Sequence, residues 1–305
     1  MIREFARRYR GPGGVVLGLI LMVSGITVST AAEPVVLWKR NFESPAIRSL
    51  LAIALEKTPE YGEADLVSSV PISQARALRY LEHGRHKGVR VANVASSPER
   101  NSTLQPIRIP IDQGLLGFRV CLISEGDQPR FDGIYTASQF RERGLRIGQG
   151  AHWPDTRILR ASGFEVVTVP RFENLLSMLE RQRFDCFLRG AGEVLIDLAQ
   201  YDSDDIVVEE RLLFTYRMPS FFFVGPDDER LAQRIETGLH RAMQDGSYEQ
   251  WFSDHFRKPM KQLKLMERVF IPLPNPYLNG QDTPIQLPLM PIRAERFLPV
   301  PEGTR

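Results

Sequence analysis

A fixed positive charge stands in a short loop after a largely apolar run, at Arg100. The run 91–95 (VANVA) ends at Ser96 and Ser97, and the sequence SSPER leads to the arginine. A guanidinium group can hold a carboxylate through two hydrogen bonds, and serine hydroxyls and backbone N–H groups can bind a further oxygen. This combination favours binding of an acidic small molecule. The alternative is a solvated loop in which Arg100 pairs with Glu99.

A second loop with useful residue types is GQGAHWP, residues 148–154. Glycines such as Gly150 let the backbone turn sharply, and the helix expected from Pro154 would present its first N–H groups to an anion. His152 and Trp153 are candidates for polar and stacking contacts. Equally, Trp153 can anchor the helix and His152 can be a surface turn residue. A phosphate-binding loop is not indicated, because no lysine follows the GxG.

The chain carries no motif for enzyme chemistry. It has no GxSxG or HExxH sequence, and its five histidines are scattered. The carboxylates at 201–205 (YDSDD) fit a solvated turn better than an acid–base pair. We therefore expect no catalytic site, no metal and no cofactor.

Two cysteines lie in strand-like apolar segments, Cys121 in FRVCLI and Cys186 in FDCFL. An oxidising compartment would permit a disulfide between them, the one pairing that the chain offers. Small buried thiols are also common in such strands. We expect two free, buried cysteines without the neighbours of a metal site or of an activated nucleophile.

Strands and helices alternate through most of the chain. Apolar periodicity predicts, in order, strand 34–39, helix 44–57, strand 64–70, helix 73–82 and strand 88–95. A second alternation consists of strand 145–150, helix 154–162, strand 164–169, helix 173–183 and strand 184–189. Ser44 and Pro45 are typical of a helix start. This order predicts right-handed crossovers and a mainly parallel sheet in each of two α/β units.

Two long extended segments, 107–124 and 206–224, join the units. Two helices follow, 227–246 and 248–256, and we expect them to return to the first unit. From Lys261 the chain is rich in proline. This composition predicts an extended arm over the surface with a frayed end.

The order of elements and the SPER turn at 97–100 resemble the type II periplasmic solute-binding proteins. The resemblance is closest to the branch of polar amino-acid binders (extracellular solute-binding protein family 3), in which a TPER-like turn carries an arginine. It covers about residues 34–256 and implies an α/β fold with two lobes and two crossing hinge strands. Lobe 1 would comprise 33–112 and 218–260, lobe 2 with the hinge strands 113–217, and the C-terminal arm 261–305.

The resemblance also implies roles for single residues. Arg100 would hold the carboxylate of the ligand, with Ser96 and Ser97 beside it at the end of a strand, where α/β sheets bind ligands. The loop 148–154 would line the cleft from the second lobe. Phe42, after the first strand, would form an aromatic floor or pack under the first helix.

The sequence departs from the family at RFDCFLRGAGE. Polar amino-acid binders have an aspartate there that holds the ammonium group of the ligand, and here Arg189 and Gly190 stand in its place. Either the ligand has no ammonium group, or Glu193 or Glu43 supplies the negative partner; both can also be solvated surface charges. The two arginines at positions 100 and 189 would face each other across a closing cleft. We therefore expect a ligand with two acidic groups, or with one acid and an uncharged polar end.

The N-terminus predicts a signal peptide. It has four arginines, a short apolar core at 15–28 and the small residues STAA, and we expect cleavage after Ala32. The core is shorter than the ~20 residues of a membrane span. Residues 1–32 carry a net charge of +3, so the remaining chain carries −1 instead of +2. This charge gives no reason to expect nucleic acid or an acidic membrane as a partner.

Together these features predict a soluble monomer in the periplasm that captures a small anionic or amino-acid-like solute between two lobes. Its partners would be that solute and the membrane subunits of an ABC importer. A sensory or regulatory binding module of the same fold is the alternative. An exported hydrolase has no supporting motif.

Overall fold

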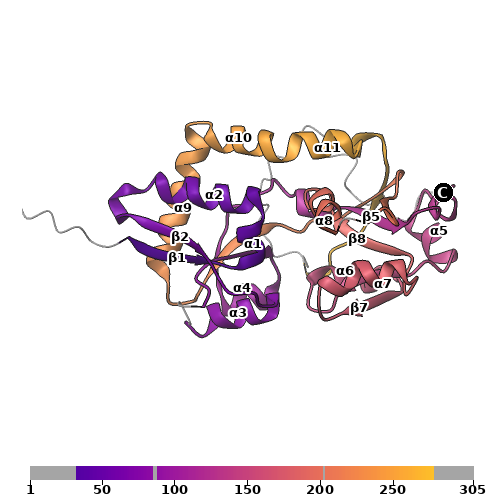
Figure 1. Ribbon diagram of the computed structural model, residues 1–305, viewed down its shortest axis with the longest axis horizontal. Coiled ribbons are helices and arrows are strands. Elements are labelled where there is room, and N and C mark those ends of the chain that lie inside the picture. The colour runs from indigo at the N-terminus through magenta and orange to yellow at the C-terminus, as the bar shows by residue number, and fades with distance from the viewer. Residues whose placement is uncertain (1–31, 85–87, 202, 278–305) are drawn as a thin grey trace, which may run out of the picture. The chain divides into compact units, whose positions relative to one another are not determined.

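The structure is a computed structural model that describes residues 32–84, 88–201 and 203–277 (Figure 1). The signal peptide expected at 1–32 lies, except for its last residue, outside the described residues. Within these ranges no helix is long and apolar enough to cross a membrane. The described strands form three sheets, and we call the parts of the chain that build them lobe 1 and lobe 2.

Lobe 1 contains two small sheets. One pairs β1 (Glu33–Leu37) in parallel with β2 (Ala64–Ser68), and the other has β11 (Ser220–Val224) antiparallel between β3 (Ala92–Ala95) and β4 (Gln105–Ile107). A parallel bridge from Leu37 to Val91 connects them, so the expected parallel sheet is divided. The helices of this lobe are α1 (Lys39–Glu43), α2 (Pro45–Glu56), α3 (Gln74–Glu82), α4 (Pro98–Thr103) and α9 (Glu229–Gln244).

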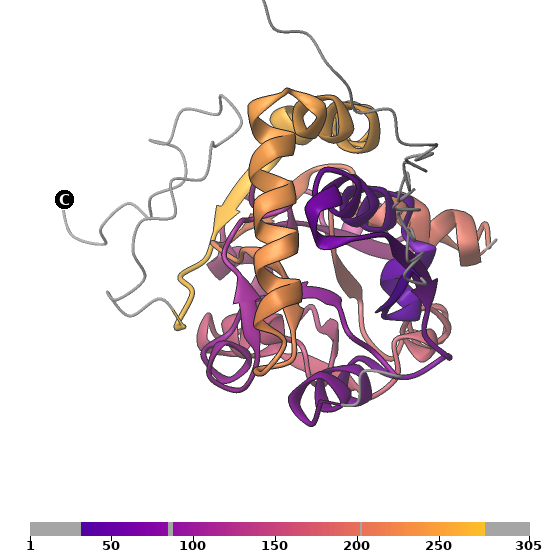
Figure 2. The ribbon, with the colours of Figure 1, turned by 90° about the vertical axis from the view of Figure 1, so that its left-hand side faces the viewer.

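The start of α2 agrees with its sequence signal. The Ser44 side chain accepts a hydrogen bond from the backbone N–H of Ile47, and Pro45 occupies the first turn. The apolar face of α2 packs against α9, as the indigo and orange helices in Figure 2 show. Helix α1 was not predicted. Because this helix begins at Lys39, the first strand ends at Leu37, two residues earlier than expected. The helix carries Arg40.

Lobe 2 contains one larger sheet, with strand order β12-β10-β5-β8-β6-β7 and with β9 paired to β5. Its strands are β5 (Phe118–Ser124), β6 (Ile147–Gly150), β7 (Val166–Val169), β8 (Cys186–Gly190), β9 (Ile206–Val208), β10 (Leu212–Thr215) and β12 (Val269–Pro272). Strand β6 is parallel to β7 and β8, as expected, whereas β5 is antiparallel to β8 and β10. The helices are α5 (Ala137–Glu142), α6 (Pro154–Ala161), α7 (Glu173–Glu180) and α8 (Val194–Tyr201).

Two segments cross between the lobes, residues 108–117 and 216–219, and they contact each other closely. The backbone N–H of Tyr216 donates to the carbonyl of Gly117 at 3.1 Å. A Cβ at Gly117 would lie only 2.0 Å from the carbonyl oxygen of Tyr216, so no side chain fits there. The expected pair of crossing segments is thus present, and glycine allows them to approach.

The C-terminal part of the described chain makes a third connection. Helix α10 (Ser247–Phe252), a π-helical turn (Ser253–Arg257) and α11 (Lys258–Gln262) lead from lobe 1 to β12, which pairs in parallel with β10 of lobe 2 (Figure 2). We expected an extended arm over the surface from Lys261. Instead, this stretch includes the end of a helix and a strand of the sheet. The rest of the arm, from residue 278, lies outside the described residues.

Cys121 and Cys186 form a disulfide, which corrects the expectation of two free thiols. Strands β5 and β8 are antiparallel neighbours, and Cys121 stands opposite Leu188 in their register. Cys186 lies two residues before Leu188 on β8, and the Cα atoms of the two cysteines are 5.1 Å apart, within the range that a disulfide spans. The sequence pattern identified both as buried strand residues but did not show that the two strands are neighbours.

Candidate functional site

A cavity of about 540 Å³ lies between the lobes. Lobe 1 contributes residues that follow β1 and β3, and lobe 2 contributes residues that follow β6, β7 and β8. The crossing segment 108–117 supplies another part of the wall. The cavity therefore lies at the carboxyl ends of strands, where α/β folds bind ligands, and its volume suits a small molecule.

Arg100 lines this cavity and is already held by the protein. Its guanidinium group donates to the carbonyl of Ala95 at 2.6 Å and to the side-chain oxygen of Gln74 at 2.8 Å. It also donates to the carbonyl of His152, in lobe 2, at 3.2 Å. Burial lowers the pKa of Arg100 to about 10, although the charge of Asp155 opposes this shift. Among the described residues, Arg100 forms no ion pair.

Ser96 and Ser97 shape the loop and do not line the cavity. The Ser97 hydroxyl caps α4 by accepting a hydrogen bond from the backbone N–H of Arg100 at 3.3 Å. Ser96 exchanges hydrogen bonds with the side chain of Asn101. Both serines therefore fix the backbone from which Arg100 extends, and a direct ligand contact of either remains a prediction.

In the second loop, Trp153 lines the cavity and Gly150 lies against its ring. A Cβ at Gly150 would be 2.6 Å from the indole, so a larger residue would displace it. Trp153 also stacks with Phe172 at a centroid distance of 6.2 Å. It is thus an anchor of the fold and a part of the wall. His152 is not among the lining residues and contributes its backbone carbonyl to Arg100.

Arg189 lines the cavity at the end of β8, but its charge is paired. Its Nε and one terminal nitrogen lie 2.6 Å from Asp197, and the other terminal nitrogen lies 3.2 Å from Glu193. Burial alone would lower the pKa of Arg189, but the two carboxylates outweigh it and raise the pKa. This corrects the expectation of two unpaired arginines, at 100 and 189, facing each other across the cavity.

Glu193 fills the space beside Gly190. A Cβ at Gly190 would lie 2.5 Å from Glu193 Oε2, so the carboxylate occupies the place of a side chain at position 190. Arg119 approaches the same oxygen to 3.6 Å. Burial would raise the pKa of Glu193, but the guanidinium groups of Arg189 and Arg119 lower it. The carboxylate expected as a negative partner for a ligand is therefore already engaged by the protein.

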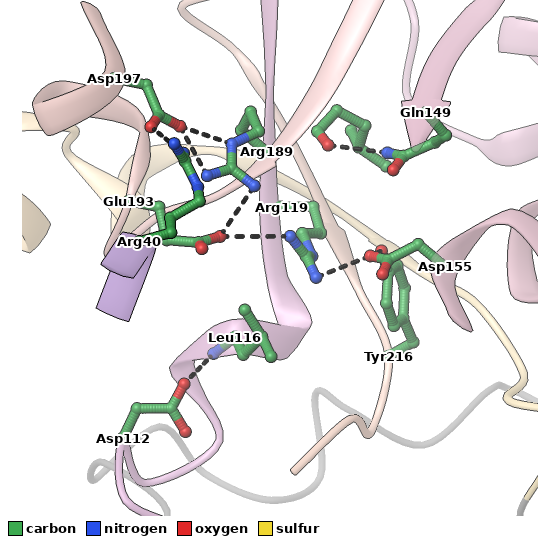
Figure 3. A network of polar contacts seen from close by, with 11 residues as sticks. Arg40, Asp112, Leu116, Arg119, Gln149, Asp155, Arg189, Glu193, Asp197 and Tyr216 are labelled. Atoms are coloured by element: carbon green, nitrogen blue, oxygen red, sulfur yellow. Dashed lines mark hydrogen bonds and ion pairs between the residues drawn. The ribbon is translucent and has the colours of Figure 1, made fainter. Parts of the chain in front are cut away.

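Arg119, Asp155 and Tyr216 extend this network on the lobe 2 side (Figure 3). Arg119, at the start of β5, lies 2.6 Å from Asp155, in the first turn of α6. The Tyr216 hydroxyl donates to the same carboxylate at 2.5 Å. None of these three residues was predicted as a site residue. Arg119 could have been recognised as a candidate because it is a charged residue inside the apolar run GFRVCLI.

Arg40 reaches from α1 of lobe 1 to lobe 2. Its guanidinium group lies 2.9 Å from Asp197 and 3.6 Å from the centroid of the Phe172 ring. A cation over an aromatic face with a carboxylate beside it is a favourable arrangement. Figure 3 shows Arg40 and Arg189 on the same carboxylate. Arg40 was not among the predicted site residues, because its short helix was not predicted.

Asp112 lies on the cavity wall within the crossing segment 108–117. Its carboxylate accepts a hydrogen bond from the backbone N–H of Leu116 at 2.8 Å (Figure 3) and another from the backbone N–H of Gly114 at 3.2 Å. Among the described residues it forms no ion pair. Burial, together with the charge of Glu193, raises the pKa of Asp112 to about 6, although its backbone hydrogen bonds oppose the shift.

The two predicted residues after the first strand have different surroundings. Glu43 lines the cavity and forms an exposed ion pair with Lys39 at 3.1 Å. Phe42 is not among the lining residues; it packs against the apolar core, and the Arg48 guanidinium lies 5.3 Å from its ring centroid. The position of Phe42 agrees with packing under the first helix.

The structure thus brings half of the predicted site residues together on one cavity: Arg100, Trp153, Arg189, Glu193 and Glu43. The other half supports the wall from outside it: Ser96, Ser97, Gly150, His152 and Phe42. Within the described part of the chain, no group of three or more His, Cys, Asp or Glu side chains is placed to hold a metal ion.

No protein-family model matches the chain, and no curated protein matches it in sequence. Solved structures do match. An amino acid ABC transporter substrate-binding protein of Streptococcus pneumoniae, bound to L-arginine, is 13% identical with a TM-score of 0.57, over 75% of this chain and 96% of that one. A Salmonella typhimurium periplasmic binding protein with high arginine specificity is 13% identical with a TM-score of 0.56, over 74% and 100%. The GluR0 ligand-binding core of Nostoc punctiforme, in complex with L-glutamate, is 16% identical with a TM-score of 0.52, over 73% and 99%.

This chain has the two-lobed fold of the periplasmic solute-binding proteins. The fold expected from the order of strands and helices is therefore confirmed. Nearly the whole length of each similar structure corresponds to about three quarters of this chain, so about a quarter of this chain has no counterpart in them.

Proposed function

We propose that the protein binds a small solute with an acidic group in the cavity between its lobes and does not convert it chemically. The observation that carries this proposal is Arg100, a buried guanidinium on the cavity wall without a carboxylate partner among the described residues. The fold supports a binding role, since the similar structures are binding proteins or ligand-binding cores.

The hydrogen bonds of Arg100 leave room for a ligand. Three of its five N–H donors reach protein oxygens, at Ala95, Gln74 and His152. The fall of its pKa to about 10 reflects the cost of burying the charge. A carboxylate in the cavity would offset this cost by pairing with the remaining N–H groups. A neutral solute would not.

We further propose that the protein acts in the periplasm after loss of residues 1–32, as a monomer, and delivers its solute to the membrane subunits of an ABC importer. The Streptococcus pneumoniae structure, itself a substrate-binding protein of such a transporter, supports this assignment by analogy. A sensory module is the second candidate. The third connection through β12 favours it, because this segment links the lobes to the chain that continues beyond residue 277.

Calorimetric titration of protein recovered from the periplasm tests the proposal. The probes are single amino acids, dicarboxylates and neutral sugars, with Arg100→Ala beside the wild type. Removing one partner of a buried charge pair costs about 3–5 kcal/mol, so we expect Arg100→Ala to weaken binding of an acidic solute at least ~100-fold. Arg183→Ala removes an exposed arginine of lobe 2 and should leave affinity unchanged. Two results would contradict the proposal: tight binding of a neutral sugar, or an acidic solute that binds Arg100→Ala as tightly as it binds the wild type.

A further inference from the structure

An ion pair with a buried carboxylate joins the two lobes at the cavity wall. The Arg40 guanidinium, on α1 of lobe 1, lies 2.9 Å from Asp197 Oδ1, on α8 of lobe 2. It also lies 3.6 Å from the ring centroid of Phe172, which directly precedes α7 of the same lobe. All three residues line the cavity. Arg40 therefore contacts two elements of lobe 2 although it belongs to lobe 1.

Helix α1 is attached firmly to the rest of lobe 1. Its first backbone N–H, that of Lys39, donates to the Ser69 hydroxyl at 2.9 Å. Asn41, the residue after Arg40, is buried. Its side chain donates to the carbonyl of Asn93 in β3 at 3.1 Å and accepts from the backbone N–H of Asn93 at 2.8 Å. These bonds hold α1 on lobe 1, so Arg40 cannot follow lobe 2 when the lobes move apart. The ion pair thus requires the lobes to be together.

Within this network, the charges of lobe 2 balance only when Arg40 is included. Lobe 2 contributes two guanidinium groups and three carboxylates, a net charge of −1: Arg119, Arg189, Asp155, Glu193 and Asp197. Arg40 brings the net charge to zero (Figure 3). It takes a position that Arg189 leaves open, because Arg189 contacts Asp197 Oδ2 at 2.6 Å whereas Arg40 contacts Oδ1. Separation of the lobes would leave one oxygen of this buried carboxylate without its cation.

Two other polar contacts between the lobes are weaker. Glu99 of lobe 1 lies 3.6 Å from Arg157 of lobe 2, but both are exposed, and exposed ion pairs contribute little to stability. Arg100 reaches lobe 2 only through the neutral carbonyl of His152. Arg40 differs, because its carboxylate partner is 4% exposed and an aromatic ring lies against its guanidinium group.

We propose that Arg40 is a latch that holds the two lobes together without a solute in the cavity. Both partners of the latch belong to the protein, so this inference goes beyond the proposed function and does not depend on the ligand. The latch also differs from the third connection. That connection is covalent and limits how far the lobes separate, whereas the latch is a reversible contact that sets how often they separate. A solute would then enter during an opening of the latch instead of causing the lobes to close.

Distances between two spin labels, measured without added solute, test the latch. The labels are attached to cysteines that replace exposed Asp65 in lobe 1 and Arg181 in lobe 2. We expect one narrow distance distribution for this parent. Arg40→Gln removes the charge and should raise the ratio of separated to closed molecules about 5- to 30-fold, the combined range of an ion pair and a cation–π contact.

Reversing the charge should open the lobes further. Arg40→Glu places a negative charge beside Asp197 and Glu193, so its distribution should extend to longer distances than that of Arg40→Gln. High salt should return Arg40→Glu towards the parent, because it screens the repulsion. Arg48→Glu makes the same change of charge at an exposed position of lobe 1 outside the cavity wall, and it should resemble the parent.

The same series with Ile271→Asp, at a position of β12 that is 1% exposed, ensures that the third connection does not conceal the effect. The latch is overturned if the lobes of the parent are already separated. It is also overturned if, in both series, Arg40→Glu and Arg40→Gln match their parent or differ from it no more than Arg48→Glu does. Should Arg40→Glu fail to fold, Arg40→Gln decides by the same criterion. Because no solute is added, the titration with Arg100→Ala remains a separate test of the proposed function.

Discussion

Among single residues, the buried charges of the cavity differ in whether the fold compensates them. Arg189 has two carboxylates within 3.2 Å, and its guanidinium lies 5.2 Å from the centroids of the Trp153 and Phe172 rings. Its position is therefore structural, and a ligand would have to displace those partners to reach it. Arg100 and Asp112 are compensated only by hydrogen bonds. Ligand selectivity should accordingly depend on these two residues more than on the network.

Asp112 should make the protein less stable as the pH rises. Its pKa is near 3.8 in an unfolded chain and about 6 in the folded protein, so the folded state holds the proton more tightly between these values. Its contribution to the free energy of unfolding is thus fully present below pH ~4 and is lost as the pH passes ~6, by about 3 kcal/mol at ~1.4 kcal/mol per unit. Urea unfolding from pH 4 to 7 should show Asp112→Asn gaining stability relative to the wild type over this window.

The difference between the two proteins isolates Asp112 from the other titrating groups around it. Glu193, Arg119 and Tyr248 interact with its charge and are the same in both proteins. Asp227→Asn, an exposed change on lobe 1 outside the cavity wall, should run parallel to the wild type. If the Asp112→Asn curve also runs parallel, then Asp112 does not change its protonation on unfolding in this range.

The sequence revealed some of these residues and not their partners. Arg189 was recognisable because a charge stands directly at the end of an apolar run, and Arg100 because it stands in the SPER turn that follows such a run. Asp197 was not, since VLIDLAQ reads as an apolar helix and its rotation relative to β8 cannot be read from one sequence. Asp112 gave no signal, because it lies in a crossing segment without periodicity.

Among the elements, helices with an apolar face were predicted well, and two of them, α2 and α3, also have a serine that caps the N-terminus. The structure has α2, α3, α6, α7 and α9 inside the predicted ranges, within a few residues at each end. The segment 107–124 was predicted as one extended run but contains the end of β4, an irregular crossing and β5. Strand β12 was missed because its surroundings are rich in proline. Its edge position explains how Pro272 is accommodated there.

The disulfide between β5 and β8 should stabilise the sheet that carries Arg119 and Arg189. It closes a loop of 65 residues, for which the chain-entropy model gives about 4 kcal/mol and typical measurements give 2–4 kcal/mol. Replacing both cysteines by alanine should lower the free energy of unfolding by about that amount in urea. Dithiothreitol should destabilise the wild type and leave the double variant unaffected. If the oxidised wild type, the reduced wild type and the double variant were equally stable, the disulfide would not contribute to the free energy of unfolding.

For the whole molecule, the lobes share more than two crossing segments. One cluster of buried apolar side chains extends from Leu50 in lobe 1 to Phe187 in lobe 2 and includes Trp251 and Phe256 of the third connection. A Cβ at Gly192 would lie 2.9 Å from the Phe256 ring, so this ring lies directly on the start of α8. Hinge motion that separates the lobes would have to break this packing or carry the third connection along.

The third connection should therefore restrict how far the lobes separate in the absence of ligand. Ile271 of β12 is 1% exposed within the core of lobe 2 and pairs with Phe214. Ile271→Asp would bury an unpaired charge there and should detach β12. Spin labels on cysteines replacing exposed Asp65 in lobe 1 and Arg181 in lobe 2 report the distance between lobes.

We expect one narrow distance distribution for the otherwise unchanged protein, and a broader one, extending to longer distances, for Ile271→Asp. Lys261→Asp, an exposed change on α11, should resemble the parent. The reason is that two flexible crossings permit a hinge, whereas a third connection anchored in the sheet removes much of its freedom. A broad distribution in the parent that Ile271→Asp leaves unaltered would mean that segments 108–117 and 216–219 alone determine the separation of the lobes.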